Sequence, residues 1–183
     1  YWITDALVRW MSPILSFTAQ EIWEAMPGER PHRFVFGVTE AEIPKAGGRA
    51  EVNWSLIQSA KRVVNQAIEA ARTDGLVKGS LSAEVELFAA GPIFHALAAL
   101  GEELRFVTIT SEATLGRLKE APDQAISDAT CPDLSVVVKV AETEKCERCW
   151  HHRLDVGWVP VHPALCRRCV DNIEGAGEER TFA

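Results

Sequence analysis

The sequence of 183 residues lacks any long hydrophobic run, and no stretch approaches the roughly 18 consecutive apolar residues that a membrane-spanning helix needs. It also lacks a basic region followed by an apolar stretch near its start, so we do not expect a signal peptide there. Positive charge is scarce, with 19 Lys and Arg against 26 Asp and Glu and a net charge of −7. Because a free-standing nucleic-acid binder is usually basic overall, any such role must rest on a local patch.

The composition is that of a chain that buries a core. Hydrophobic residues make up 47% and charged residues 25% of the sequence, a balance that excludes wholesale disorder and fibrous or collagen-like classes. The length suits one full domain plus a small module. The first residues, Tyr1 to Ala6, include no initiator Met and continue directly into a helical pattern. We therefore expect the chain to be part of a longer protein.

Four of the five cysteines form two C-x-x-C pairs, Cys146 with Cys149 and Cys166 with Cys169. Two residues between cysteines let both thiolates reach one ion, and two such knuckles complete a tetrahedron with Zn–S distances of about 2.3 Å. Because all four ligands come from the protein, the spacing predicts one closed, structural Zn²⁺ site. A secreted disulfide scaffold would spread its cysteines through loops, so this pattern also predicts a cytoplasmic location.

Other interpretations of the cysteine pairs remain open. A rubredoxin-like iron centre and redox disulfides use similar pairs, although no βαβ pattern lies beside these. His151, His152 and His162 lie nearby and are alternative ligands, but with four thiolates present we expect them at the surface or around the site. Cys131 stands apart, and we interpret it as a small, partly buried side chain.

Hydrophobic periodicity predicts an α+β multidomain fold that begins with helices. Residues 1–79 are expected to be mainly helical. One helix is expected to end or bend at Pro13, and a second to start at Thr18 with a capping box. The clearest pattern covers residues 53 to 73, with Asn53 as its N-cap.

A change to period two marks a second part, residues 80–142, which we expect to be a small α+β unit. Within it, residues 115–130 are expected to form a polar connection. The last part, residues 143–183, is expected to be a zinc ribbon or finger. Strands are expected near residues 34–36, 83–88, 105–109 and 134–140, and a short helix over 92–100.

The zinc module carries the local basic patch. Five cations and two anions lie between residues 145 and 170, although a bound Zn(Cys)₄ centre adds two negative charges. A rigid knuckle that presents an indole and guanidinium groups suits unpaired bases and phosphates. The alternative is that Trp150 and Trp158 form the module's own small core, which we favour for Trp158 and leave open for Trp150. The candidate RNA-binding residues are Trp150, Arg148, Arg167, Arg168, Lys61 and Arg62, the last two being on the long helix, where a solvated face is the alternative.

Several segments together resemble one known family. Leu7 to Trp23 (LVRWMSPILSFTAQEIW) resembles the anticodon-binding helical domain of class I aminoacyl-tRNA synthetases for branched aliphatic amino acids. The segments that follow resemble bacterial isoleucyl-tRNA synthetases in the same order along the chain. They are Val64–Glu69, Gly79–Leu81, Gly101–Val107, the finger from Cys146 to Cys169 with Cys149-Trp150-His151, and Gly177–Ala183.

The resemblance implies a function in tRNA binding. The parent enzyme is implied to be a cytoplasmic, monomeric ligase that uses ATP and Mg²⁺ to attach isoleucine to its tRNA. Residues 1–79 are implied to be the C-terminal part of the helical anticodon-binding domain. The chain is implied to hold the anticodon stem-loop and to work with the rest of the synthetase chain, without a membrane. The family's His-Ile-Gly-His-like and Lys-Met-Ser-Lys-like catalytic segments are absent from these residues. We therefore expect no catalytic residue here and no isoleucine activation by this chain alone, with ATP and Mg²⁺ confined to the missing catalytic domain.

Two rival functions come from other classes of protein. A related finger ends the formamidopyrimidine-type DNA glycosylases, which would make this chain a tail that reads duplex DNA. That function predicts a helix–two-turn–helix before the finger, whereas strand-like runs precede it here. The second rival is a structural zinc ribbon that contacts another protein and no nucleic acid.

Overall fold

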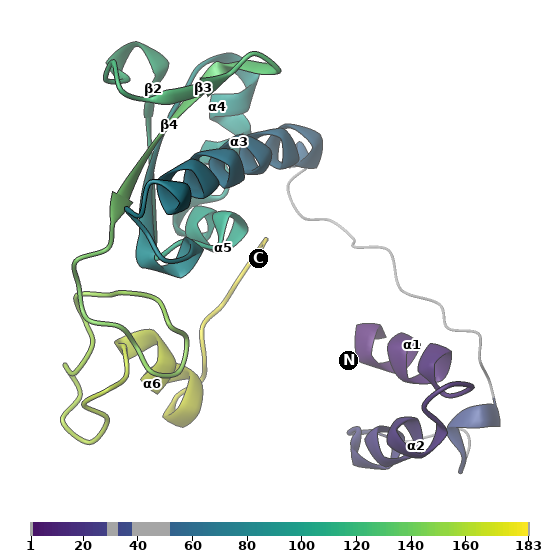
Figure 1. Cartoon of the computed structure of the whole chain (residues 1–183). Helices are drawn as coiled ribbons and strands as arrows, with labels where there is room; N and C mark the ends of the chain where they lie inside the picture. Colours follow the sequence, from purple (N-terminus) through teal and green to yellow (C-terminus); the bar gives the residue numbers. More distant parts are fainter. Residues whose placement is uncertain (1, 29–32, 38–51, 183) are drawn as a thin grey trace. The chain divides into compact units, whose positions relative to one another are not determined.

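The computed structural model of this chain describes residues 2–28, 33–37 and 52–182. These residues form two compact units, residues 1–49 and residues 50–183 (Figure 1). The mixture of helices with one four-stranded sheet and a four-cysteine cluster confirms the predicted α+β class.

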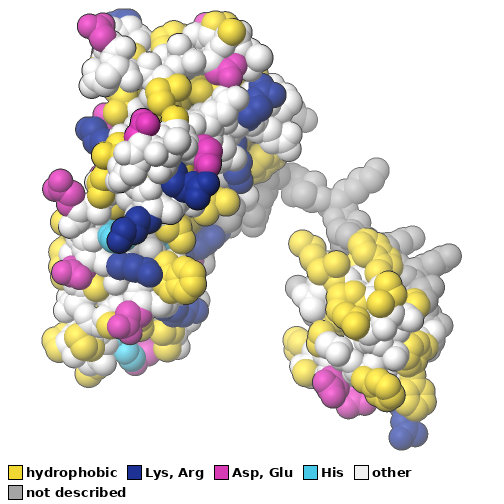
Figure 2. All heavy atoms as spheres, viewed as in Figure 1, with side chains coloured by type: hydrophobic (Ala, Val, Ile, Leu, Met, Phe, Trp, Pro, Cys, Tyr) yellow, Lys and Arg dark blue, Asp and Glu magenta, His cyan; other side chains and the backbone are white. Residues whose placement is uncertain are grey.

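The described residues of the N-terminal unit form two short helices and a 3-10 turn. Helix α1 covers Trp2–Met11, helix α2 covers Ser16–Ala25, and the 3-10 turn η1 covers Val35–Gly37. Its small core is made by Val8, Ala19, Trp23, Met26 and Val35. Many other large apolar side chains of this unit are exposed, and Figure 2 shows hydrophobic side chains over much of its visible surface.

Two local predictions for this unit are wrong. Helix α2 does not start at Thr18, because main-chain hydrogen bonds from Leu15 to Met11 and from Ala19 to Leu15 already close a turn there. The expected strand at residues 34–36 is η1, where the N–H of Val35 donates to the Gln20 side chain at 3.0 Å. In contrast, α1 ends just before Pro13, as predicted.

The larger unit is built on one sheet with strand order β2-β1-β4-β3. Strand β1 is parallel to β2 and antiparallel to β4, and β3 is antiparallel to β4. The strands are β1 (Ala83–Ala89), β2 (Glu112–Arg117), β3 (Ile126–Asp128) and β4 (Cys131–Val140). The helices are α3 (Trp54–Thr73), α4 (Gly91–Ala98), α5 (Leu104–Thr108) and α6 (Arg167–Glu174). Short 3-10 turns lie at η2 (Ser80–Ser82), η3 (Gly101–Glu103) and η4 (Leu118–Glu120).

The core of this unit lies between α3 and the sheet. Alternate residues of β1 are buried, as period two requires, and they meet the apolar stripe of α3. Its fully buried members include Ile57, Val63, Val64, Leu87, Leu97 and Leu134. Helix α3 therefore packs with the sheet, on β4 and α4. The division of the chain into domains at residues 79 and 142 stays a prediction from the sequence.

The segment between β1 and β2 is helical where a strand was expected. Residues 105–109 belong to α5 and its left-handed end, with Ile109 at a φ of 59°. The reason is local: Leu104 and Thr108 are buried one turn apart, and the Thr108 hydroxyl donates to the Leu104 carbonyl at 3.0 Å. Five residues are too few to reveal a helical period. Strands β2 and β3 fall partly in the segment expected to be a polar connection.

The N-cap of α3 can be tested directly by substitution of Asn53. Asn53 caps the helix as predicted, and its Oδ1 accepts a hydrogen bond from the N–H of Leu56 at 3.3 Å. Asn53→Ala is expected to lower the free energy of unfolding of the larger unit by about 1 kcal/mol, measured by denaturant titration. Asn53→Asp keeps the acceptor and is expected to unfold like the unaltered chain. An equal loss in both variants would contradict the capping role.

Candidate metal centre and nucleic-acid interface

The structure brings the four predicted ligands together in the C-terminal module. Cys146 and Cys149 lie in a turn that follows β4, closed by a bridge between Lys145 and His152. Cys166 lies directly before the first residue of α6, and Cys169 lies in the first turn of that helix. A loop and a helix start thus supply one knuckle each. Within the part of the chain that the structure describes, this is the group of side chains suited to a metal ion.

The sulfur positions fit a tetrahedral zinc site. The four Sγ atoms all lie within 4.8 Å of one another, and those of Cys149 and Cys166 are 3.7 Å apart. A tetrahedron with Zn–S bonds of about 2.3 Å has sulfur–sulfur edges of about 3.8 Å. Cys146, Cys166 and Cys169 are fully buried, which leaves no open position for a substrate. The donor set and its closure therefore suit a structural metal.

Burial, hydrogen bonds and neighbouring charges shift the pKa values of the thiols in different directions. Burial raises the pKa of Cys149, but hydrogen bonds from Arg168 and from the backbone of His151 outweigh burial and lower that pKa to about 7. Burial raises the pKa of Cys166, and the neighbouring Cys149 raises it further. Four thiolates this close repel one another, so a cation among them is what lets all four ionise together.

The three nearby histidines lie outside the sulfur cluster. The ring of His151 is buried and meets the Phe106 ring edge-on, with centroids 5.8 Å apart. Burial and several arginines lower the pKa of His151 to about 4, so its ring is neutral at pH 7. His152 contacts the Thr143 carbonyl at 2.6 Å, and His162 pairs with Glu174 at 2.6 Å. Their surroundings agree with the expected positions around the site.

Both tryptophans of the module point to solvent. Trp150 is 59% exposed and Trp158 is 67% exposed, so the core role that we favoured for Trp158 is wrong. The sulfur cluster fills the centre of the module together with Val156 and Leu165, which leaves no need for an indole there. Trp150 has a left-handed backbone with φ of 66°, and its N–H donates to the Cys146 carbonyl at 2.9 Å. Its position is therefore set by the knuckle.

Trp150 lines a cleft between the module and the rest of the larger unit. The cleft has a volume of about 620 Å³. One wall is the connection from α3 to β1, with Leu76 and Lys78, and the other wall includes Lys145, whose Nζ lies 5.0 Å from the centre of the Trp150 ring. Neither lysine is among the RNA-binding residues proposed from the sequence, because only the fold brings them beside the indole.

The three arginines next to the ligands have different surroundings. Arg167 is mostly exposed, with only a 3.9 Å contact to Asp171. Arg148 donates to the Cys169 sulfur at 3.6 Å. The side chain of Arg168 is 14% exposed and donates to Glu178 at 2.8 Å. The guanidinium of Arg168 is therefore paired within the module. Its predicted contact with RNA stays a prediction that this geometry does not support.

Lys61 and Arg62 lie on α3, away from the cleft residues. They line a shallow polar depression of about 530 Å³ with Asn65 and other side chains of the same helix face. Arg62 also donates to the Thr130 hydroxyl at 3.1 Å, which ties it to the turn between β3 and β4. We call the sheet and the helices packed on it, without the zinc module, the sheet unit. Cys131 is buried in the core of this sheet unit, as we expected of a small apolar side chain, and burial raises the pKa of its thiol.

Comparisons with known proteins match both parts of this description. Residues 1–87 match the anticodon-binding domain of tRNA ligase, and residues 144–172 match a zinc finger found in FPG and IleRS. In the described part of the chain, every helix is too short or too polar to cross a membrane.

Curated relatives cover the whole chain. The isoleucine–tRNA ligase of Shewanella woodyi is 47% identical over 189 residues, and that of Idiomarina loihiensis is 48% identical over 189 residues. That of Alcanivorax borkumensis is 48% identical over 186 residues. Each match covers 100% of this chain and 20% of the relative, so the chain spans about a fifth of their length. The chain thus matches the C-terminal region of bacterial isoleucine–tRNA ligases, an anticodon-binding domain followed by a zinc finger.

Proposed function

We propose that this chain is the tRNA-binding C-terminal part of an isoleucine–tRNA ligase. The observation that carries the proposal is the exposed indole of Trp150, fixed by a four-cysteine knuckle beside a cleft with two lysines. The match over the full chain to relatives named isoleucine–tRNA ligase supports the same function. The working location would be the cytoplasm, where thiolates stay reduced and tRNA is charged.

The contribution of this chain to the parent reaction is positioning. The absent catalytic domain would hold ATP, Mg²⁺ and isoleucine, and no residue of this chain takes part in the bond changes. A grip on the anticodon stem-loop fixes the distant acceptor end in register with that domain. Such positioning accounts for large rate effects without any chemical group, because it removes the entropy of alignment from the reaction step. Zn²⁺ when bound holds the two knuckles together.

The cleft beside Trp150 suits an unpaired base of the anticodon region. An exposed indole provides a stacking surface for any base, and an ammonium group beside it provides a contact for phosphate. Lys78 and Lys145 line the same cleft, and the Lys145 ammonium lies over the indole ring, 5.0 Å from its centre. Lys61 and Arg62 provide a second, separate positive region on α3 for the stem. Arg167, exposed at the start of α6, is the remaining positively charged contact proposed for the tRNA.

Binding of isoleucine tRNA in comparison with a DNA duplex of equal length tests the proposal. Electrophoretic binding at several stated salt concentrations is expected to show tighter binding of the tRNA. Preference for the duplex would instead indicate the glycosylase-type tail, and binding of neither would indicate a protein-contacting ribbon. The glycosylase alternative is not favoured, because strand β4 runs directly into the knuckle and residues 1–87 match an anticodon-binding domain.

Arg167 distinguishes a phosphate contact from a structural arginine. Arg167→Ala is expected to weaken tRNA binding uniformly and to reduce the slope of binding against salt by about 1, as the loss of one phosphate contact does. Arg72→Ala is the matched control, since Arg72 is also exposed but pairs with Glu69 at 2.6 Å. Arg168→Ala removes contacts inside the module and is expected to lower its stability. Equal salt slopes for the Arg167 variant and the unaltered protein would remove Arg167 from the interface.

A further inference from the structure

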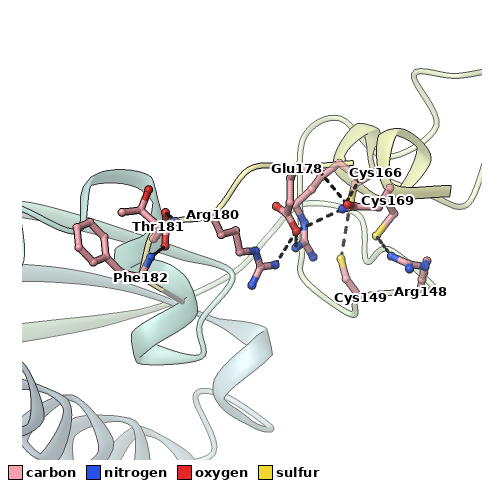
Figure 3. A network of polar contacts seen from close by, with 11 residues as sticks. Arg148, Cys149, Cys166, Cys169, Glu178, Arg180, Thr181 and Phe182 are labelled. Atoms are coloured by element: carbon pink, nitrogen blue, oxygen red, sulfur yellow. Dashed lines mark hydrogen bonds and ion pairs between the residues drawn. The ribbon is translucent and has the colours of Figure 1, made fainter. Parts of the chain in front are cut away.

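The last residues of the chain connect the zinc module to the sheet. The segment 175–182, which we call the C-terminal tail, leaves α6 and reaches back to η3 and α5 (Figure 3). Gly177 starts this return with a left-handed φ of 83°, and its N–H donates to the Asp171 carbonyl at 3.1 Å. The next N–H, that of Glu178, donates to the Asn172 side chain at 3.0 Å. The tail is thus first held against α6.

The far end of the tail is anchored on the sheet unit. The N–H groups of Thr181 and Phe182 both donate to the carboxylate of Glu103, each at 2.6 Å. Such bonds to an ionised acceptor are among the stronger hydrogen bonds in proteins. Phe182 also packs against the core of the sheet unit. The anchor therefore combines one carboxylate with one apolar contact, across more than seventy residues of sequence.

Arg168 joins the tail to the sulfur cluster. It lies between the ligands Cys166 and Cys169 in the first turn of α6, and its guanidinium donates to Glu178 at 2.8 Å. Glu178 also pairs with Arg180 at 2.7 Å, and both arginines lie over the Phe106 ring of α5, at 5.0 and 4.0 Å from its centre. A continuous set of contacts therefore runs from Arg168, between two of the ligands, to α5.

We propose that the C-terminal tail is a metal-coupled clamp, in which Arg168 and Glu103 are positioning residues that hold the zinc module against the sheet. Metal binding joins the two knuckles and so fixes Arg168 and Glu178, which set the path of the tail toward Glu103. The clamp is independent of the function proposed above. If that function holds, the clamp also keeps the two walls of the Trp150 cleft in register, because one wall belongs to the module and the other to the sheet unit.

Hydrogen exchange at the tail amides tests the coupling in the unaltered chain. With zinc bound, the amides of Thr181 and Phe182 are expected to be protected, as followed by NMR. Removal of zinc with a chelator is expected to abolish their protection, although Glu103 and the sheet core are still present. Without coupling, these amides would keep their bonds to Glu103 while the module unfolds. Retained protection after chelation would therefore overturn the proposal.

Glu103→Gln tests the same coupling from the other end. Its amide side chain has one acceptor oxygen in place of two, so the tail amides are expected to lose protection while the chain still takes up one zinc. Because coupling between two events is reciprocal, the apparent zinc affinity in competition with a chelator is expected to fall about fivefold or more. The control is Glu102→Gln, the neighbouring carboxylate, which is 90% exposed and lies 3.8 Å from Arg105. Equal zinc affinity in the two variants would show that the tail and the metal are independent.

Discussion

Cys166→Ser is expected to abolish zinc binding and to unfold the C-terminal module while the sheet unit stays folded. The buried centre of the module consists of the sulfur cluster with only Val156 and Leu165 packed against it. A core of this size does not support a fold, and in small zinc modules the metal contributes about 10–16 kcal/mol of apparent binding energy. The sheet unit has its own core between α3 and β1 and does not need the metal.

Elemental analysis and circular dichroism measure this result. The unaltered chain is expected to contain one zinc per molecule and the Cys166 variant none, with most of the helix and strand signal retained. Cys131→Ser is the control, since that cysteine is buried in the sheet core and lies outside the sulfur cluster. It is expected to retain its zinc. Iron in place of zinc would contradict the metal assignment, and melting of the whole chain in the Cys166 variant would contradict the separate stability of the two parts.

The parts that the sequence predicted well are those determined by local spacing. The two C-x-x-C pairs identify their ligands because two intervening residues confine both sulfurs to one knuckle. Helix α3 and strand β1 are long enough for their periods of 3.6 and 2 to stand out. Asn53 is a cap because its own side chain bonds three residues onward. Each of these features depends on residues close together in the chain.

The parts that the sequence could not predict depend on contacts between distant residues. Arg167 and Arg168 look alike in sequence, yet Arg168 is buried by Glu178 and Phe106 while Arg167 faces solvent. Such a difference follows only from the return of the tail. Trp158 shows the same effect, because whether an indole enters a core depends on what else fills it. The five-residue helix α5 was missed because so short a segment carries no period.

Trp150→Ala is expected to weaken tRNA binding by the whole protein without loss of zinc. Stacking of an indole on an unpaired base contributes about 1–3 kcal/mol, or roughly 5- to 150-fold in affinity. Trp150 is 59% exposed and outside the buried centre of the module, so its truncation removes little packing. The backbone at this position has the same left-handed strain with Ala as with Trp, so the comparison isolates the ring.

Trp158→Ala is the matched control for that measurement. Trp158 lies in the same module with an even larger exposed fraction, but it is not among the residues that line the cleft. If the cleft is the RNA site, tRNA affinity measured at one stated salt concentration falls in the Trp150 variant and is unchanged in the Trp158 variant. An equal loss in both would mean that exposed indoles act non-specifically. Loss of zinc or early melting in the Trp150 variant would instead assign that ring to the stability of the knuckle, because stacking on RNA requires a module that is folded and metal-loaded before the tRNA arrives.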